Sequence, residues 1–111
     1  DLAIHRGPAT ASRLGPEDRR PLAEVCYASL GRGEVTSRGR KIVGLSQRRR
    51  RQGALIQCGM MRVWKPQPLI TALGVEAASE AIHEAAVGLD DVLPSPASDA
   101  SVIRAVQAHL A

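Results

Sequence analysis

The chain has 111 residues, of which 44% are hydrophobic, and Tyr27 and Trp64 are its only aromatic residues. This length suits one domain with a modest, aliphatic and alanine-rich core. The net charge of +4 and the pI near 9.8 favour an anionic partner but do not bear on the fold. No run reaches the ~18 apolar residues of a membrane span, so we expect no membrane association and a cytoplasmic location.

The N-terminal third is predicted to contain two strands and a loop. Residues 1–6 alternate weakly and stop at a Gly-Pro pair, which is typical of the end of a strand, and residues 9–21 are a polar connection. The run 22–30 is predicted to be the first clear strand, with Cys26 on the face of Ala28.

The central stretch predicts a β-hairpin over residues 34–47 with its turn near residues 37–39. Four arginines at 48–51 then lead to a third run at 53–64. A charge block at a turn is most often a solvated tip, and its functional interpretation is contact with a phosphate or an acidic partner. Nucleic acid is the weaker alternative, because no aromatic side chains are interleaved there for base stacking.

The C-terminal part predicts helices at residues 68–73 and 77–87, each followed by glycine, and a last helix capped by Ser98. The last helix has four apolar residues on one face: Val102, Ile103, Val106 and Leu110. We therefore expect an α+β fold, with a small, mostly antiparallel sheet over residues 1–64 that is packed on one side by a helical tail over residues 67–111.

Lys41 is the most informative charged residue. Strand alternation places it on the same face as Val43 and Leu45, where an ammonium is costly unless it reaches water or an anion. Two interpretations stay open: an edge-strand lysine that opposes aggregation, and a lysine aimed at an anionic or carbonyl-bearing substrate. The glycines at 39 and 44 suit the second, because a strand glycine often marks close approach of a ligand.

Cys26 and Cys58 are the only cysteines, and they lack the spacing of a zinc or redox site. We predict no metal site built from protein ligands and no disulfide in a reducing compartment. Cys26 has two open interpretations: a small buried hydrophobe, or a catalytic thiol activated by a nearby cation such as Lys41 or an arginine.

Four segments together resemble the lipoate-protein ligase and octanoyltransferase family, whose members are related in fold to biotin protein ligase. They are residues 25–28 (Val-Cys-Tyr-Ala), 33–35 (Gly-Glu-Val), 39–49 (Gly-Arg-Lys-Ile-Val-Gly-Leu-Ser-Gln-Arg-Arg) and 57–58 (Gln-Cys). The resemblance implies a protein-modifying enzyme that attaches a lipoyl or octanoyl group to a lysine of a lipoyl carrier domain.

The family pattern implies roles for five residues of the central hairpin. Lys41 matches the lysine that contacts the acyl carbonyl and, in the ligases, the phosphate of the acyl-adenylate. Gly44 would leave room for the acyl chain, and Gly39, Ser46 and Gln47 belong to the same substrate-binding motif. In the ligase branch, ATP and Mg²⁺ would activate lipoate.

Cys26 matches the catalytic cysteine of some octanoyltransferases of the family. It would take an octanoyl group from acyl carrier protein as a thioester before passing it to the carrier lysine. Those enzymes commonly have Leu-Gln-His-Gly in the third strand, where residues 56–59 read Ile-Gln-Cys-Gly.

The family's Arg-Arg-x-x-Gly-Gly-Gly pocket loop lies upstream of this motif and does not occur in the sequence. We therefore expect residues 1–111 to be the C-terminal half of a biotin/lipoate protein ligase-like domain. Two alternatives remain: a non-catalytic basic module that binds an acidic protein or nucleic acid through residues 48–51, and an inactive fragment.

Overall fold

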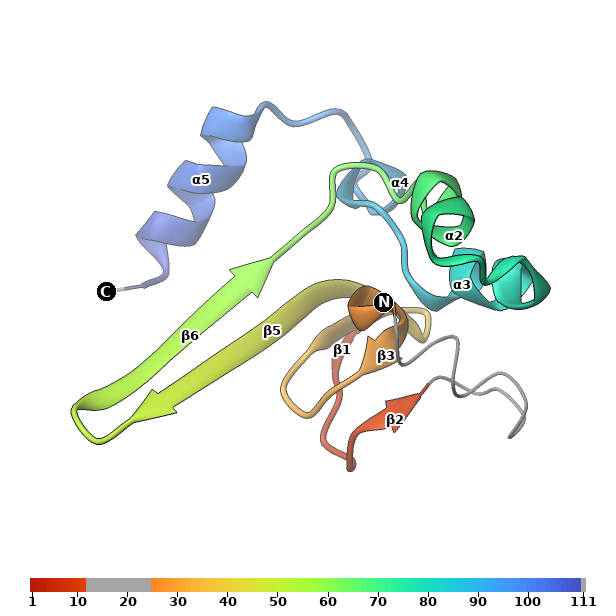
Figure 1. Ribbon diagram of the computed structural model, residues 1–111. Helices are drawn as coiled ribbons and strands as arrows, with labels where there is room; N and C mark the ends of the chain where they lie inside the picture. The colour runs from red at the N-terminus through yellow and green to blue at the C-terminus, as the bar shows by residue number, and fades with distance from the viewer. Residues whose placement is uncertain (12–24, 111) are drawn as a thin grey trace.

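The computed structural model of the chain describes residues 1–11 and 25–110, which form an α+β fold (Figure 1). A four-stranded antiparallel sheet has the order β1-β4-β5-β6, and β2 pairs with β3 separately. The strands are β1 (Leu2–Ile4), β2 (Thr10–Ala11), β3 (Ser29–Leu30), β4 (Val35–Ser37), β5 (Arg40–Arg50) and β6 (Gly53–Gly59). The helices are η1 (Cys26–Ala28), α2 (Gln67–Leu73), η2 (Glu76–Ala78), α3 (Ser79–Ala85), α4 (Leu89–Val92) and α5 (Asp99–Ala108), where η marks 3₁₀ turns.

The central hairpin of β4 and β5 is confirmed, including its turn. Arg38 and Gly39 form a two-residue connection with φ values of 50° and 80°. Positive φ at both positions is the geometry of the type I′ turn, whose twist matches that of the flanking strands. Gly39 therefore occupies this exposed turn position because glycine adopts positive φ without strain.

The strand predicted over residues 22–30 is wrong for residues 25–28, and residues 22–24 lie outside the described part of the chain. Residues 26–28 form η1, closed by a 2.8 Å hydrogen bond from the Ala28 N–H to the Val25 carbonyl. A 3₁₀ turn places positions i and i+3 on one side, so Val25 and Ala28 can both be buried against the helices. In a strand these two side chains would face opposite ways.

The core lies between η1 and the helices rather than under the whole sheet. Its buried members are Val25, Ala28, Ile70, Val75, Ala78 and Ile82, with Trp64 and Ala85 packed against them. The Trp64 indole N–H donates to the Ile82 carbonyl at 3.1 Å, which joins the segment after β6 to α3. The expected helix ends are partly confirmed: α2 ends at Gly74 in the left-handed conformation, whereas α3 stops earlier than predicted, at Ala85.

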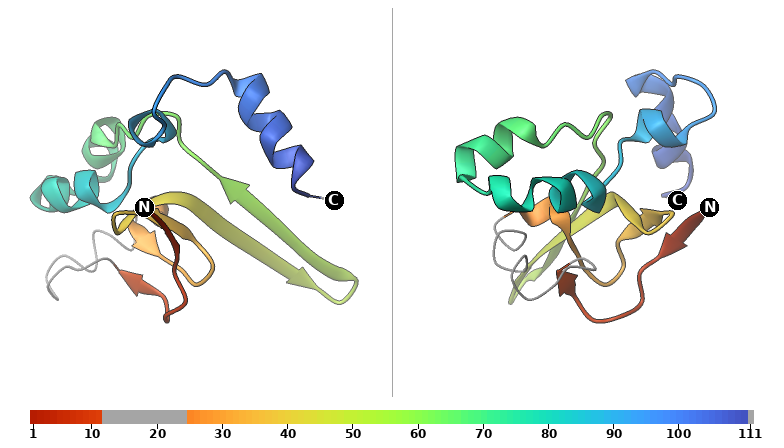
Figure 2. Two further views of the ribbon diagram at one scale, coloured as in Figure 1. Left: turned by 180° about the vertical axis from the view of Figure 1, so that it is seen from behind. Right: turned by 90° about the vertical axis from the view of Figure 1, so that its right-hand side faces the viewer.

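The far end of the sheet is a two-stranded arm, which we call the β5–β6 ribbon (residues 45–59). All its residues are exposed, and Figures 1 and 2 show it running away from α2 and α3. The radius of gyration is 15.0 Å, against about 13 Å for a compact chain of this length. The ribbon accordingly contributes little to the core.

The last helix begins where its sequence predicts, but its packing differs. The Ser98 hydroxyl caps α5 by accepting the Ser101 N–H at 3.1 Å. No residue of α5 is buried, and its apolar residues Ile103 and Val106 are 55% and 45% exposed. The expectation that this helix packs over the sheet is therefore wrong, because its apolar face meets no other described element closely enough to be covered.

A close backbone crossing fixes the segment after β6 against the segment after α3. A Cβ at Gly88 would lie 2.5 Å from the Arg62 carbonyl oxygen and 2.7 Å from the Val63 Cα. Two hydrogen bonds hold the crossing, from the Leu89 N–H to the Met61 carbonyl at 2.8 Å and from the Asp90 N–H to the Arg62 carbonyl at 3.1 Å.

We expect Gly88→Ala to lower the free energy of unfolding by about 2–3 kcal/mol, because rigid backbone cannot yield to the added methyl group. The matched control is Gly59→Ala, where an added Cβ has no neighbour within 4 Å. Urea unfolding measures both. Equal unfolding midpoints for the two variants would contradict the close crossing.

Candidate functional site

Lys41 is buried, with 3% of its surface exposed, although it is charged. Its Nζ lies 2.8 Å from Glu34 Oε2 and 5.1 Å from the centroid of the Tyr27 ring. The ammonium thus has one carboxylate partner and one aromatic face, both within the range of favourable electrostatic contact.

A β-bulge brings Lys41 to this position. Thr36 pairs with Lys41 and Val35 pairs with Val43, so Ile42 is the extra residue in β5. Lys41 and Ile42 are consequently both buried, at 3% and 4% exposure. The expected shared face of Lys41 and Val43 is therefore wrong.

Lys41 instead shares a side with Gly44, three residues along the strand. A Cβ at Gly44 would lie 2.9 Å from the Tyr27 ring and 3.6 Å from Glu34 Oε1, the same two residues that contact the ammonium. Among the described residues, the room left by Gly44 is taken by the Tyr27 ring. Its predicted role beside an acyl chain stays a prediction.

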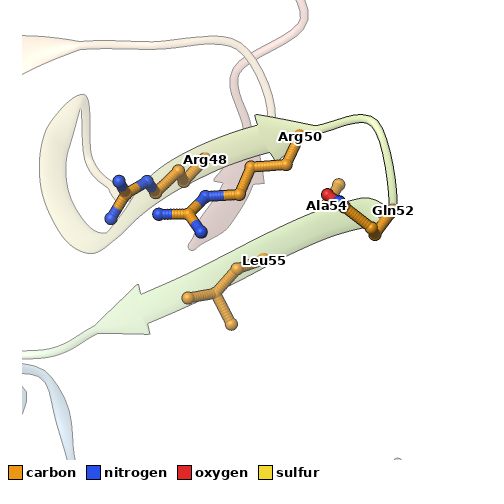
Figure 3. A pocket seen from close by; sticks show the side chains of 6 residues that line it. Arg48, Arg50, Gln52, Ala54 and Leu55 are labelled. Carbon is orange, nitrogen blue, oxygen red and sulfur yellow. The ribbon is translucent and has the colours of Figure 1, made fainter.

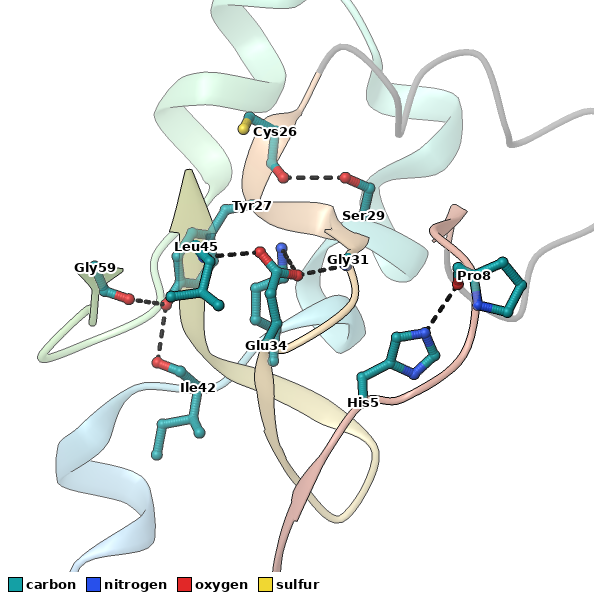
Figure 4. A network of polar contacts seen from close by, with 11 residues as sticks. His5, Pro8, Cys26, Tyr27, Ser29, Gly31, Glu34, Ile42, Leu45 and Gly59 are labelled. Atoms are coloured by element: carbon teal, nitrogen blue, oxygen red, sulfur yellow. Dashed lines mark hydrogen bonds and ion pairs between the residues drawn. The ribbon is translucent and has the colours of Figure 1, made fainter. Parts of the chain in front are cut away.

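The Glu34 carboxylate is fixed from three directions. Its Oε2 accepts the Gly31 N–H at 2.6 Å as well as the Lys41 ammonium, and its Oε1 accepts the Leu45 N–H at 3.0 Å (Figure 4). Burial, the largest single influence, raises the pKa of this carboxyl, but the hydrogen bonds from Gly31, Lys41 and Leu45 together outweigh it and lower the pKa below its usual value. Glu34 therefore stays ionised and holds the ammonium in one place.

Tyr27 closes the site from the side of η1. Its hydroxyl lies 2.9 Å from the Ile42 carbonyl and 3.1 Å from the Gly59 carbonyl, so its single hydrogen is shared between the ends of β5 and β6 (Figure 4). Burial raises the pKa of the hydroxyl, which keeps it neutral at physiological pH. The ring packs against Trp64 at a centroid distance of 5.4 Å, which joins the site to the core.

The backbone of β5 is tied to the end of α3. The Lys41 carbonyl accepts the Val87 N–H at 2.9 Å. The Arg40 guanidinium donates to the His83 and Glu84 carbonyls at 3.1 and 3.2 Å, where a cation suits the C-terminus of a helix. Helix and strand together therefore set the position of Lys41.

Cys26 and Cys58 are both exposed free thiols. Cys26 lies in η1, and its carbonyl accepts the Ser29 hydroxyl at 3.2 Å (Figure 4). Within the described residues, the ion pair and the aromatic contact of Lys41 involve Glu34 and Tyr27, not the thiol. The buried interpretation of Cys26 is therefore wrong, and its catalytic role stays a prediction.

Ser46 and Gln47 lie outside the buried cluster, on the exposed β5–β6 ribbon. The Ser46 hydroxyl is 3.4 Å from Gln57 Oε1 across the two strands. Gly39 lies at the opposite end of β5, in the turn. The structure thus brings Lys41 and Gly44 together and separates them from the other three residues of the motif.

Sequence reasoning gave no role to Glu34, although a signal was present. A two-residue turn at 38–39 pairs Thr36 with Lys41, and Glu34 shares the face of Thr36. Diagonal neighbours of this kind are within reach of long side chains, so the register alone predicts a contact between Glu34 and Lys41.

No known protein family, curated protein or solved structure matches the chain. In the described ranges 1–11 and 25–110, no group of three or more His, Cys, Asp or Glu side chains is arranged to hold a metal ion. No helix there is long and apolar enough to span a membrane. The reactive group that this site offers is the ammonium of Lys41, which is buried and held in place by Glu34.

We expect Glu34→Gln to lower the free energy of unfolding by about 2–3 kcal/mol at pH 7, since it removes charge-assisted hydrogen bonds from a buried cation. Because the folded pKa of Glu34 lies below the usual 4.5, its contribution is complete above about pH 4.5 and is lost as the pH falls through the folded value.

The difference between parent and variant should therefore shrink in acid, measured by urea unfolding at several pH values. Glu80→Gln, at an exposed position of α3, is the matched control and should change stability by less than about 0.5 kcal/mol. A difference that stays constant from neutral to strongly acidic pH would contradict the assignment.

Proposed function

We propose that this chain belongs to an enzyme of lipoate metabolism that attaches a lipoyl or octanoyl group to a lysine of a lipoyl carrier domain. The observation that carries the proposal is the buried Lys41 ammonium, held by Glu34 within the motif at residues 39–49 that resembles the ligase and octanoyltransferase family. The proposed role of Lys41 is to bind the acyl carbonyl or an acyl phosphate.

The electrostatics support this role. A fixed cation in a site with little water stabilises an oxyanion as it develops, because no solvent has to reorganise. An ammonium has three N–H donors, and among the described residues the Lys41 ammonium contacts one carboxylate oxygen of Glu34 and the face of the Tyr27 ring. An N–H of Lys41 therefore remains to donate to a carbonyl or phosphate oxygen that reaches Nζ. The ion pair with Glu34 holds the ammonium in one orientation.

The donor substrate distinguishes two versions of the reaction. In the ligase version, the free acid would react with ATP to give the acyl-adenylate and pyrophosphate, with Lys41 holding a phosphate oxygen of the adenylate. The carrier lysine amine would then attack the acyl carbonyl, forming the amide and releasing AMP. In the octanoyltransferase version, the Cys26 thiolate would attack the carbonyl of a donor thioester and release the donor thiol. The amine of the carrier lysine would then attack the acyl-cysteine, forming the amide and restoring the thiol.

We expect Lys41→Met to reduce acyl transfer about 100-fold or more, the loss typical of removing one donor to a developing oxyanion. The natural protein that contains this chain is incubated with a lipoyl carrier domain and either octanoate or lipoate with ATP, or octanoyl-acyl carrier protein. The mass of the carrier domain reports transfer.

Lys65→Met, at an exposed position, is the matched loss of charge and should leave transfer unchanged. Because Lys41→Met leaves the Glu34 anion without its partner, the double variant Lys41→Met with Glu34→Gln is made alongside. Undiminished transfer by a folded variant lacking Lys41 would rule out its proposed role.

We expect Cys26→Ser to abolish transfer from octanoyl-acyl carrier protein and to eliminate an octanoylated form of the enzyme, if the thioester route is used. ATP-dependent transfer should survive the same change. Cys58→Ser is the matched control, since both thiols are exposed. Full activity of Cys26→Ser with the carrier-protein donor would exclude the thioester.

A further inference from the structure

The tip of the β5–β6 ribbon carries the whole net charge of the chain. The sequence has 15 Lys and Arg and 11 Asp and Glu, so without the arginines at 48–51 the basic and acidic residues are equal in number, 11 each. Residues 45–59 contain no acidic residue. Within the described part of the chain, the ion pairs involve Lys41 and Arg62, and none involves these four arginines.

Two of the arginines share one face of the ribbon with an exposed leucine. Arg48 pairs with Leu55 across the strands, and Arg50 pairs with Gly53. Figure 3 shows the two guanidiniums lying along the strand on the side of Leu55. This face borders an open depression of about 610 Å³, which Gln52, Gly53 and Ala54 at the end of the ribbon also line.

The β5–β6 ribbon packs against too little of the described structure for a purely structural role to explain it. A two-stranded hairpin without a third strand or a covering helix is marginally stable in water. Leu55 and Ile56 are 57% and 60% exposed, on opposite faces of the same strand. An arm that exposes apolar side chains beside unpaired cations gains stability when a partner covers it.

We propose that the face formed by Arg48, Arg50 and Leu55 docks an acidic protein domain. Carboxylates of the partner would accept from the two guanidiniums, and an apolar side chain among them would pack on Leu55 in the depression. The width and openness of this face suit a protein surface better than a small ligand, which sites usually enclose. This docking proposal does not require the proposed acyl transfer. If the chain does transfer acyl groups, the docked domain is the lipoyl carrier domain that accepts them.

Charge argues against a second copy as the occupant, and composition argues against single-stranded nucleic acid. A second copy would bring a face with the same arginines against this one, and like charges in an interface cost affinity. Single-stranded nucleic acid is bound with stacked aromatic side chains, and residues 45–59 have none. An acidic domain satisfies both the cations and the exposed leucine.

The test is binding of a fluorescently labelled, net negatively charged lipoyl carrier domain to the natural protein that contains this chain, at low and high salt. The matched variants are Arg48→Ser with Arg50→Ser, and Arg49→Ser with Arg51→Ser. Each removes two charges from the ribbon tip. Only the first pair alters the leucine face, because Arg49 pairs with Ala54 on the other face and Arg51 lies in the turn.

We expect the first pair to weaken binding at least tenfold, because it removes both guanidiniums that the partner's carboxylates would accept from, whereas the second pair should weaken it only a few-fold. Leu55→Ser should also weaken binding, and high salt should weaken it in the parent. Equal effects of the two pairs, affinity independent of salt, absence of binding, or tighter binding of a DNA oligonucleotide or anionic vesicles would each overturn the proposal.

The two proposals fail separately. Normal docking by a Lys41→Met protein that still transfers acyl groups would contradict the function of Lys41 alone. Lys41-dependent transfer with equal effects of the two arginine pairs would contradict the docking face alone.

Discussion

The buried pair of Lys41 and Glu34 is the interaction on which the described structure depends. Through the Glu34 carboxylate, it joins the turn at Gly31 to β5 at Leu45, and through the Lys41 carbonyl, β5 is joined to the segment after α3. Replacing a buried ion pair with apolar residues is often neutral or stabilising, so stability alone is a weak reason for a small domain to contain one. The pair is therefore compatible with the proposed role of the ammonium in binding an acyl group.

The sequence predicted the elements whose ends are set by single residues. The hairpin turn follows from a glycine that tolerates positive φ, the end of α2 from Gly74, and the start of α5 from the Ser98 cap. These local preferences act within a few residues, so they can be identified without knowing what packs nearby. The α+β class and the antiparallel sheet followed from them.

The errors arise where tertiary packing overrides a local pattern. Residues 25–28 have strand composition, but burial of both Val25 and Ala28 on one side requires a turn. Strict alternation also fails at Ile42, because the bulge that rotates Lys41 inward is stabilised by Tyr27, a residue distant in sequence. Of the candidate site, Lys41 itself was identified, and its partner Glu34 could have been found from the hairpin register.

Gly44 marks the boundary between the two parts of the molecule. Up to this residue, β5 is held by Tyr27 and by the helices. Beyond it the strand is exposed, and apart from the bond between the Leu45 N–H and Glu34 its described backbone partner is β6. Ser46 and Gln47, predicted to bind substrate, lie beyond this boundary, and Ser46 shares the ribbon face of Arg48. Their side chains are nearer in the strand to the arginines than to the buried ammonium.

If both proposals hold, the length of the ribbon would set the distance between the docking face and the Lys41 ammonium. At about 3.3 Å per residue, the strand from Gly44 to Arg50 spans roughly 20 Å, and it is paired with β6 over that length. A domain that binds Arg48 and Arg50 through its carboxylates could present its acceptor lysine to the Lys41 ammonium only under one condition. About that distance must separate the lysine from those carboxylates on the domain's surface. Substrate choice would then depend on the spacing of two surface features of the partner rather than on the residues around its lysine.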